Sequence, residues 1–317
     1  MKHSLSFVAV FMLFVVACQK TVKSQEVMLE VSIPEVTADS TQKDVNKDLL
    51  MADIRKVIAQ RLEVEEKDIR DVEGHPNWLS VNMSGPVDTA SIDRLLSQRG
   101  EFVFWETYLS KDIANVIMEG IKKIKDGDRL ISLLNLVSND YCILGYVQEK
   151  DTAEVNRLLQ SPEIRQQLGP DVKLYWGYQE ERVSRGLFSN DETNMEDSES
   201  AFYGLFCVRG QSPVITGDKI IDAKDEMDSF NHSPIVTMKM NEEGARLFTD
   251  MTKKNIGLPI ALVMDGRVYS GPRVNMEITG GNASISGQYT PEQTKELALI
   301  LKSGILKGSA KVIVDKK

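Results

Sequence analysis

The alternation of apolar and polar positions is clearest near the start of the chain, where every second residue from Val27 to Ile33 is Val, Leu or Ile. This period of two predicts a half-buried strand. Residues 49–62 instead carry apolar side chains at helical spacing, which predicts an amphipathic helix.

The segments that follow complete an ordered set of elements. Apolar patterning predicts a hairpin of two strands, a helix that begins at Asp88 and ends before Gly100, and a strand rich in aromatic residues. Their ranges are 69–72, 78–83, 88–99 and 101–108. The order strand, helix, strand, strand, helix, strand is the ferredoxin-like pattern, so we expect an α+β fold.

The middle of the chain alternates between helical and strand periodicity. An amphipathic helix comes first, then two strands, a short helix with a continuation after a proline, and an aromatic strand. The ranges are 109–126, 130–136, 142–147, 151–160, 163–168 and 172–178. Residues 184–200 contain five carboxylates with Ser, Asn and Gly, and we expect a mobile acidic loop. A calcium loop is the alternative, but the EF-hand spacing is missing.

Turn and cap residues mark the elements of the last third. Asn241 is placed to cap a helix after a short apolar run. Asp265 and Gly266 stand between two apolar runs and predict a hairpin, because both turn residues tolerate a positive φ. Gly280 and Gly281 predict a further turn.

A last strand is predicted at residues 310–314, after a helix that begins with a capping box at Thr290. No partner strand lies near it in the sequence, so we expect it to return to the first sheet. We therefore expect a ferredoxin-like base from residues 27–107, closed by residues 309–315, with an inserted α+β head subdomain at residues 108–308.

The first eighteen residues have the organisation of an export signal. A basic start at Lys2 precedes an apolar run at residues 5–17, which ends in a small residue followed directly by Cys18. This is typical of a bacterial lipoprotein, in which the signal peptide 1–17 is removed and the cysteine carries the lipid. An uncleaved anchor or an ordinary signal is the alternative. We expect a body in the periplasm, tied to a membrane of the cell envelope through a polar tether at residues 18–26.

Composition and charge narrow the function classes. An apolar content of 42% with 27% charged residues is ordinary for a globular chain. The net charge of −9 provides no polycationic footprint, so we expect no nucleic-acid partner. No second apolar run approaches the length of a membrane span, so a multi-span transporter is not expected.

The cysteines other than Cys18 are Cys142 and Cys207, and both lie in apolar runs. We expect two buried free thiols, with a disulfide as the alternative that an oxidising compartment permits. Their spacing matches no metal site. We expect neither a metal nor a cofactor.

Few residues suggest catalysis, and each has a simpler interpretation. Asp265 is better explained by its turn than by a catalytic role. His75 and His232 lie in polar loops without a nucleophile or carboxylate that the sequence places beside them. Gly280 and Gly281 lack the Gly-Lys-Ser/Thr element of a phosphate loop. No residues support a hydrolase, and we expect no enzyme activity.

An aromatic strand is the strongest candidate for a binding surface. Tyr175, Trp176 and Tyr178 follow one another closely, and alternation places neighbours on opposite faces. An exposed aromatic face would suit unfolded polypeptide. Packing in the core is the alternative.

Three segments of the last third resemble SecD, and more closely the first large periplasmic domain of SecDF fusion proteins of the Bacteroidetes type. Their sequences are MKMNEEGARLF at residues 238–248, ALVMDGRVYSGP at 261–272 and ITGGNASISGQYT at 278–290. Asp265, Gly266, Gly280, Gly281 and Gly287 are the turn positions of these motifs. Residues 49–107, 151–156, 171–176 and 216–223 fit the same family.

The resemblance implies a function in protein export. SecDF assists the Sec channel from the outer side of the membrane, and its head is thought to hold emerging preprotein. We therefore expect this chain to bind exported or unfolded polypeptide as an accessory to Sec-dependent translocation, with Sec translocon components as candidate partners. The sequence shows no membrane helices after Val314, so we expect no proton coupling. The alternative is a structural module that docks on an envelope protein complex and has lost substrate capture.

Overall fold

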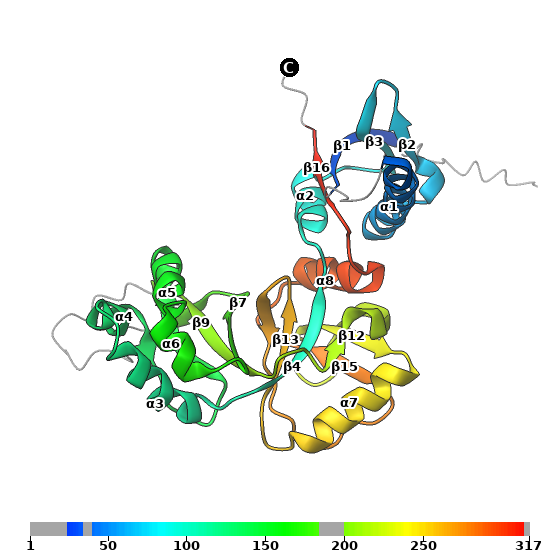
Figure 1. Ribbon diagram of the computed structural model, residues 1–317. Helices are drawn as coiled ribbons and strands as arrows, with labels where there is room; N and C mark the ends of the chain where they lie inside the picture. Colours follow the sequence, from blue (N-terminus) through cyan, green and yellow to red (C-terminus); the bar gives the residue numbers. More distant parts are fainter. Residues whose placement is uncertain (1–23, 34–39, 184–199, 314–317) are drawn as a thin grey trace, which may run out of the picture.

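The computed structural model describes residues 24–33, 40–183 and 200–313. The expected signal peptide, Cys18, most of the tether and the expected acidic loop up to residue 199 lie outside the described residues. Helices and strands are mixed, and the fold is α+β (Figure 1). No helix in the described ranges has both the length and the apolar character needed to cross a membrane.

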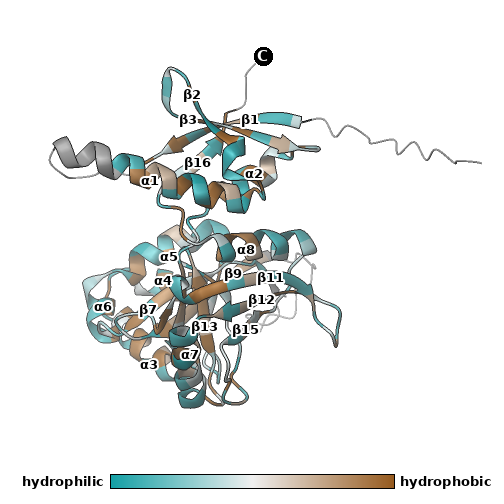
Figure 2. Cartoon of the chain, turned by 90° about the vertical axis from the view of Figure 1, so that its right-hand side faces the viewer, coloured by the Kyte–Doolittle hydropathy of each residue, from teal (hydrophilic) through white to brown (hydrophobic). Residues whose placement is uncertain are grey.

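Four strands and two helices form the base at one end of the molecule (Figures 1 and 2). The sheet has the order β16-β1-β3-β2 and is antiparallel throughout. The helices lie on one side of it (Figure 2). The elements are β1 (Ser24–Ser32), α1 (Ser40–Arg61), η1 (Glu66–Asp68), β2 (Ile69–Val72), β3 (His75–Ser84), α2 (Thr89–Ser97) and β16 (Ser309–Val312). The last strand thus returns to β1, as the sequence pattern predicts.

The strand predicted at residues 101–108 does not belong to the base, and this part of the expected division is wrong. It forms β4 (Phe102–Thr107), which pairs with β13 (Ile260–Met264) in the head. Nearly every side chain of β4 is buried, so the strand needs cover on both faces. The head provides this cover. In the base, β16 takes the place of the last strand of the ferredoxin-like order.

The head contains a nine-stranded sheet with the order β10-β4-β13-β14-β7-β9-β6-β5, and β8 pairs with β9. Because β4 also pairs with β9, five of these strands close a ring: β4, β13, β14, β7 and β9. The bounds of the other strands are β5 (Asn135–Leu136), β6 (Ile143–Gln148), β7 (Val172–Gly177), β8 (Glu181–Val183), β9 (Ser200–Arg209), β10 (Ile215–Thr216) and β14 (Arg267–Ser270).

Four helices cover one half of this sheet (Figure 1). They are α3 (Ser110–Ile121), α4 (Gly127–Leu133), α5 (Thr152–Leu159) and α6 (Pro162–Leu168), with η2 (Glu149–Asp151) before α5. The prediction of a strand over residues 130–136 is wrong, since α4 occupies most of it. Leu130 and Leu134 are both buried while Ile131 is 46% exposed, so the apolar run has one buried face at helical spacing.

The other half of the head packs on a three-stranded antiparallel sheet with the order β11-β12-β15. Its elements and their neighbours are η4 (Gly217–Lys219), β11 (Ile220–Met227), β12 (Pro234–Met240), α7 (Glu242–Lys254), β15 (Asn282–Ile285) and α8 (Pro291–Ser303). Asn241 caps α7, and its side chain accepts from the Gly244 N–H at 2.8 Å. Thr290 and Gln293 form the capping box of α8. The sequence pattern predicts no strand at β9 or β11.

One hydrophobic cluster runs from the base into this half of the head. It contains Leu29 and Leu79 of the base sheet, Leu96 of α2, Leu301 of α8 and Phe248 of α7. A second cluster lies under α3 to α6, and a third lies between the strands around Phe206. Base and head are therefore joined by apolar packing as well as by two chain connections.

The side chain of Arg61, at the end of α1, forms hydrogen bonds with both chain connections between base and head. Its guanidinium is fully buried and donates to the carbonyl groups of Leu95, Gln98, Arg99 and Gly304, and to the hydroxyl of Ser303. Burial lowers the pKa of Arg61 to about 10, and the charge of Asp265 acts against this shift. The side chain therefore stays charged at neutral pH, where its donors satisfy a cluster of carbonyl groups.

Candidate functional site

A groove of about 590 Å³ opens where β7 and β14 end, beside the loop of residues 286–288. Phe206 of β9 forms part of its lining, with Tyr141 and Tyr178 among the other aromatic residues. The motif segments at residues 269–272 and 286–288 also line it. The groove therefore combines aromatic rings with backbone from several elements.

Glycines allow the backbone to pass close to the Phe206 ring. A Cβ added at Gly177, Gly204 or Gly271 would lie 3.3, 3.4 or 3.2 Å from a ring carbon of Phe206. At Gly271 it would also lie 2.9 Å from the hydroxyl oxygen of Tyr141. Side chains at these positions would crowd the ring, so the small residues keep the groove open.

Tyrosines fix the walls of the groove. The rings of Tyr178 and Tyr269 stack with centroids 4.1 Å apart. The hydroxyl of Tyr289 donates to the Tyr269 carbonyl at 2.6 Å, and that of Tyr141 donates to the Gly271 carbonyl at 2.7 Å. Burial raises the pKa of Tyr141, Tyr269 and Tyr289, so these hydroxyls remain protonated donors.

The rim of the groove is polar and acidic. Gln179 donates from its side chain to the Gln288 carbonyl at 2.7 Å, which ties the loop after β15 to the end of β7. Glu180 accepts a hydrogen bond from the Tyr203 hydroxyl at 3.2 Å. Burial raises the pKa of Glu181, and a hydrogen bond with Tyr146 acts against this shift.

The three aromatic residues predicted as a binding surface lie in different surroundings. Trp176 is only 8% exposed, belongs to the cluster under α3 to α6 and donates from its indole N–H to Asn156 at 3.0 Å. Tyr175 is half-buried near Trp105, with ring centroids 6.3 Å apart. Tyr178 lines the groove. Trp176 therefore supports the sheet, and Tyr178 is the member of the trio that lines the groove.

The motif turns have defined structural roles. Asp265 and Gly266 have φ values of 49° and 76° and join β13 to β14, with Met264 opposite Arg267. The Asp265 carboxylate also accepts from the backbone N–H groups of Gly100 and Glu101, at 3.0 and 2.8 Å. Asp265 is thus occupied by a structural contact at the base–head connection.

Among the glycines of the other motif turns, Gly281 and Gly287 meet close neighbours. Gly280 and Gly281 have φ values of 83° and 68°, and a Cβ on Gly281 would lie 2.6 Å from that of Ala245. A Cβ on Gly287 would lie 2.8 Å from the Tyr289 ring. Gly287 lines the groove, and the absence of a side chain there lets the bordering loop pass close to the Tyr289 ring.

The histidines and cysteines are placed in structural contacts. His75 stacks on Trp78 with ring centroids 4.1 Å apart, and His232 lies in the β11–β12 turn with a φ of 55°. Cys142 and Cys207 are buried free thiols, and burial raises the pKa of both. Within the described ranges, no group of three or more His, Cys, Asp or Glu gathers to hold a metal ion.

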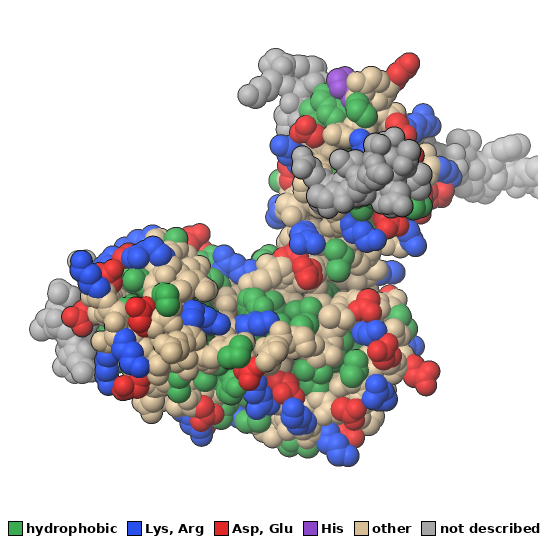
Figure 3. All heavy atoms as spheres, viewed as in Figure 1, with side chains coloured by type: hydrophobic (Ala, Val, Ile, Leu, Met, Phe, Trp, Pro, Cys, Tyr) green, Lys and Arg blue, Asp and Glu red, His purple; other side chains and the backbone are tan. Residues whose placement is uncertain are grey.

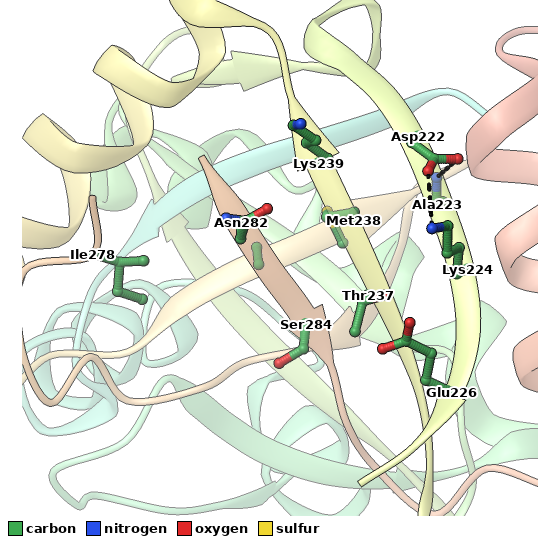
Figure 4. A pocket seen from close by; sticks show the side chains of 11 residues that line it. Asp222, Ala223, Lys224, Glu226, Thr237, Met238, Lys239, Ile278, Asn282 and Ser284 are labelled. Atoms are coloured by element: carbon green, nitrogen blue, oxygen red, sulfur yellow. Dashed lines mark hydrogen bonds and ion pairs between the residues drawn. The ribbon is translucent and has the colours of Figure 1, made fainter. Parts of the chain in front are cut away.

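A second hollow, of about 480 Å³, lies on the three-stranded sheet (Figure 4). Asp222, Lys224 and Glu226 project from β11, and Lys239 projects from β12 (Figure 4). Asp222 and Lys224 form an ion pair at 3.7 Å. This hollow carries mixed charges and has no aromatic residue among its described lining residues, so the groove beside β7 is the better candidate for binding apolar side chains.

Comparison with known proteins relates the larger part of the head to one family. Residues 190–308 match the family model of the SecDF P1 head subdomain. This part of the chain is therefore similar to the head subdomain of SecDF proteins. A protein translocase subunit SecD from Rhodothermus marinus is 35% identical over 174 residues, which are 55% of this chain and 26% of the relative. A SecD subunit from Desulfurispirillum indicum is 38% identical over 125 residues, 39% of this chain and 23% of the relative.

The chain spans about a quarter of the length of these curated relatives. A solved chain from a study of a membrane component SecDF that enhances protein export covers 92% of this chain and is itself covered completely. The two are 23% identical, with a TM-score of 0.46.

Proposed function

We propose that the SecD-like head binds exported or unfolded polypeptide and serves as a non-enzymatic accessory to Sec-dependent translocation. The observation that carries this proposal is the groove around Phe206, which presents aromatic rings beside glycine backbone in a domain related to SecD. Both relatives described above are named protein translocase subunits, which supports a function in protein export.

The groove suits an extended chain with little sequence preference. Apolar side chains of the client would pack on Tyr141 and Tyr178, because Phe206 is only 7% exposed, and the amides of Gln179 and Gln288 would offer hydrogen bonds to its backbone. Ordering a mobile chain costs conformational entropy, and the groove offers few anchors to offset it. Binding should therefore be weak and reversible, as passage of a client requires.

We also propose that a lipid on Cys18 anchors the protein in the bacterial cell envelope, with its body in the periplasm and Sec translocon components as its neighbours. Capture in the groove uses contacts from residues of the head alone. It should therefore proceed without proton coupling and without a membrane potential.

Crosslinking in cells tests the proposed function. A photoreactive residue at Gln288, on the groove rim, should crosslink to a secretory polypeptide arrested during export, because Gln288 is exposed beside Phe206. The same residue at Glu163, exposed on α6, is the matched control. Equal crosslinking from the two positions would contradict capture in the groove.

A partner-docking module is the second candidate, and one observation favours it. Phe230 is 93% exposed at the β11–β12 turn, next to the exposed Met227. The carboxylate of Asp228 accepts from the N–H groups of Phe230 and Asn231 at 2.8 and 3.1 Å, which fixes the turn. If Phe230→Ser abolishes association with the translocon while polypeptide binding persists, docking is a separate function of this turn.

A further inference from the structure

The charge of the groove points to a class of client segment. The groove has Glu180 and Glu181 among its lining residues, and none of those residues, all of them described, is Lys or Arg. Elsewhere basic and acidic side chains are interspersed over the visible face (Figure 3). Among the described lining residues, the groove thus joins carboxylates to aromatic rings.

The carboxylates lie beside aromatic groups. Glu180 accepts from the Tyr203 hydroxyl at 3.2 Å, and Glu181 shares a hydrogen bond with Tyr146. A Cβ on Gly204, the strand residue behind the groove, would lie 3.3 Å from an oxygen of Glu181. Each carboxylate is therefore held by a hydroxyl and retains acceptor capacity for a ligand.

Arg267 and Arg273 adjoin lining residues in the sequence, but they are not among the described lining residues. The Arg267 guanidinium lies over the Tyr203 ring at 5.3 Å and donates to the Gly177 carbonyl at 3.3 Å. Arg273 donates to the carbonyl groups of Gly257 and Asp140. Both cations weaken the field of the carboxylates, and the described contacts of both are with other groups.

We propose that the groove selects polypeptide segments in which Lys or Arg stands next to an aromatic or large aliphatic residue. The proposal rests on polypeptide binding in the same groove. A cationic side chain would be attracted to the two carboxylates and to the faces of Tyr141 and Tyr178. Its apolar neighbour would pack on the same tyrosine rings, because Phe206 is only 7% exposed. Segments rich in Asp and Glu would meet like charges and bind more weakly.

Three labelled, unstructured peptides of equal length test this preference. Each contains the same Phe and Leu residues, and these alternate with Lys, Gln or Glu. At low salt, the Lys peptide should bind the full-length protein about tenfold more tightly than the Glu peptide, a difference of about 1.4 kcal/mol. Added salt at about 0.5 M should remove most of the difference, because it screens charges on an open rim.

Variants locate the effect. The double variant Glu180→Gln, Glu181→Gln should weaken binding of the Lys peptide about fivefold and should change binding of the Gln peptide less than that. Glu163→Gln, on exposed α6, is the matched control and should change neither. If the double variant fails to fold, the peptide series and its salt dependence on the parent protein still decide the outcome.

Three results distinguish the two proposals. Preference for the Lys peptide that is lost in the double variant supports the inference. Equal binding of all three peptides, weakened by Tyr178→Ala, overturns the charge preference and leaves polypeptide binding intact. Failure of every peptide to bind overturns the proposed function and the preference with it.

Discussion

The guanidinium Nη2 of Arg61 donates to the carbonyl oxygen of Gly304 at 3.0 Å, across 243 residues of sequence. The same nitrogen donates to the Arg99 carbonyl at 2.9 Å. Gly304 follows the helix that leaves the head, and Arg99 precedes the strand that enters it. A single buried side chain therefore binds the outgoing and the returning connection to the end of α1.

Arg61→Met should destabilise the base–head junction strongly. The change retains most of the apolar volume but leaves several buried carbonyl groups without donors, which costs about 3 kcal/mol or more in the free energy of unfolding. Denaturant unfolding measures the loss. Hydrogen exchange should localise it to the Gly100 amide, which Asp265 holds at 3.0 Å.

Arg129→Met provides the matched control, since Arg129 is exposed and pairs with Glu154 at 3.1 Å. An exposed ion pair contributes at most about 1 kcal/mol, so this variant should unfold close to the parent. Equal losses in the two variants would show that the buried hydrogen bonds of Arg61 do not stabilise the junction.

Local signals in the sequence predicted the turns and caps. The Asp265–Gly266 pair adopts the positive φ values that its two-residue hairpin requires, and Asn241 caps α7 as its position indicates. Such features depend on residues within one turn of each other. They can therefore be predicted without knowledge of the rest of the fold.

Long-range contacts account for what the sequence could not predict. Asp265 contacts Gly100 across 165 residues, and Arg61 contacts Ser303 across 242 residues. The apolar pattern of β4 would fit the base sheet or the head sheet. The strand lies in the head because elements on both sides of it there bury its two faces. The groove could not be predicted for the same reason, because Tyr141, Phe206 and Gly287 are far apart in the sequence and come together only in the folded chain. No sequence motif indicated that the glycines around Phe206 would all lie against its ring.

Removal of residues 309–317 should destabilise the base more than the head. The deletion takes away β16, which pairs with β1 and leaves that strand with an open edge. Hydrogen exchange should show lost protection at β1 while β13 stays protected. Limited proteolysis in which the head is cleaved before the base would argue against this order.

Glu181→Gln should stabilise the protein above the raised pKa of the carboxyl group and have little effect at low pH. Burial raises the pKa of Glu181 in the folded state, so ionisation costs more there than in the unfolded chain. The cost is absent well below about pH 4.3, where both states are protonated. It grows as pH rises from there to the folded pKa, because the unfolded chain ionises first, and it is complete above the folded pKa. Thermal unfolding at pH 4 and pH 8 measures this, with an expected gain of about 1 to 3 °C at pH 8 alone. A gain of equal size at both pH values would exclude ionisation as its cause.

Cys18→Ala should release the protein from membranes, because the proposed lipid depends on that sulfur. Membrane fractionation after washing measures the release. Cys142→Ala, which alters a buried thiol of the head, is the matched control and should leave fractionation unchanged. Persistence of the Cys18 variant in the washed membrane fraction would contradict lipid anchoring.

Direct titration of an unfolded secretory protein against the full-length chain tests polypeptide capture most directly. The parent should bind with a Kd of roughly 10 to 100 µM, since few anchors offset the ordering of the client. Tyr178→Ala should weaken binding several-fold, because the ring lines the groove, whereas Tyr108→Ala, outside the lining, should not. Trp176→Ala is a poor test, since it would remove core packing. Absence of binding by the parent at high micromolar concentration would contradict the account, and so would undiminished binding by Tyr178→Ala.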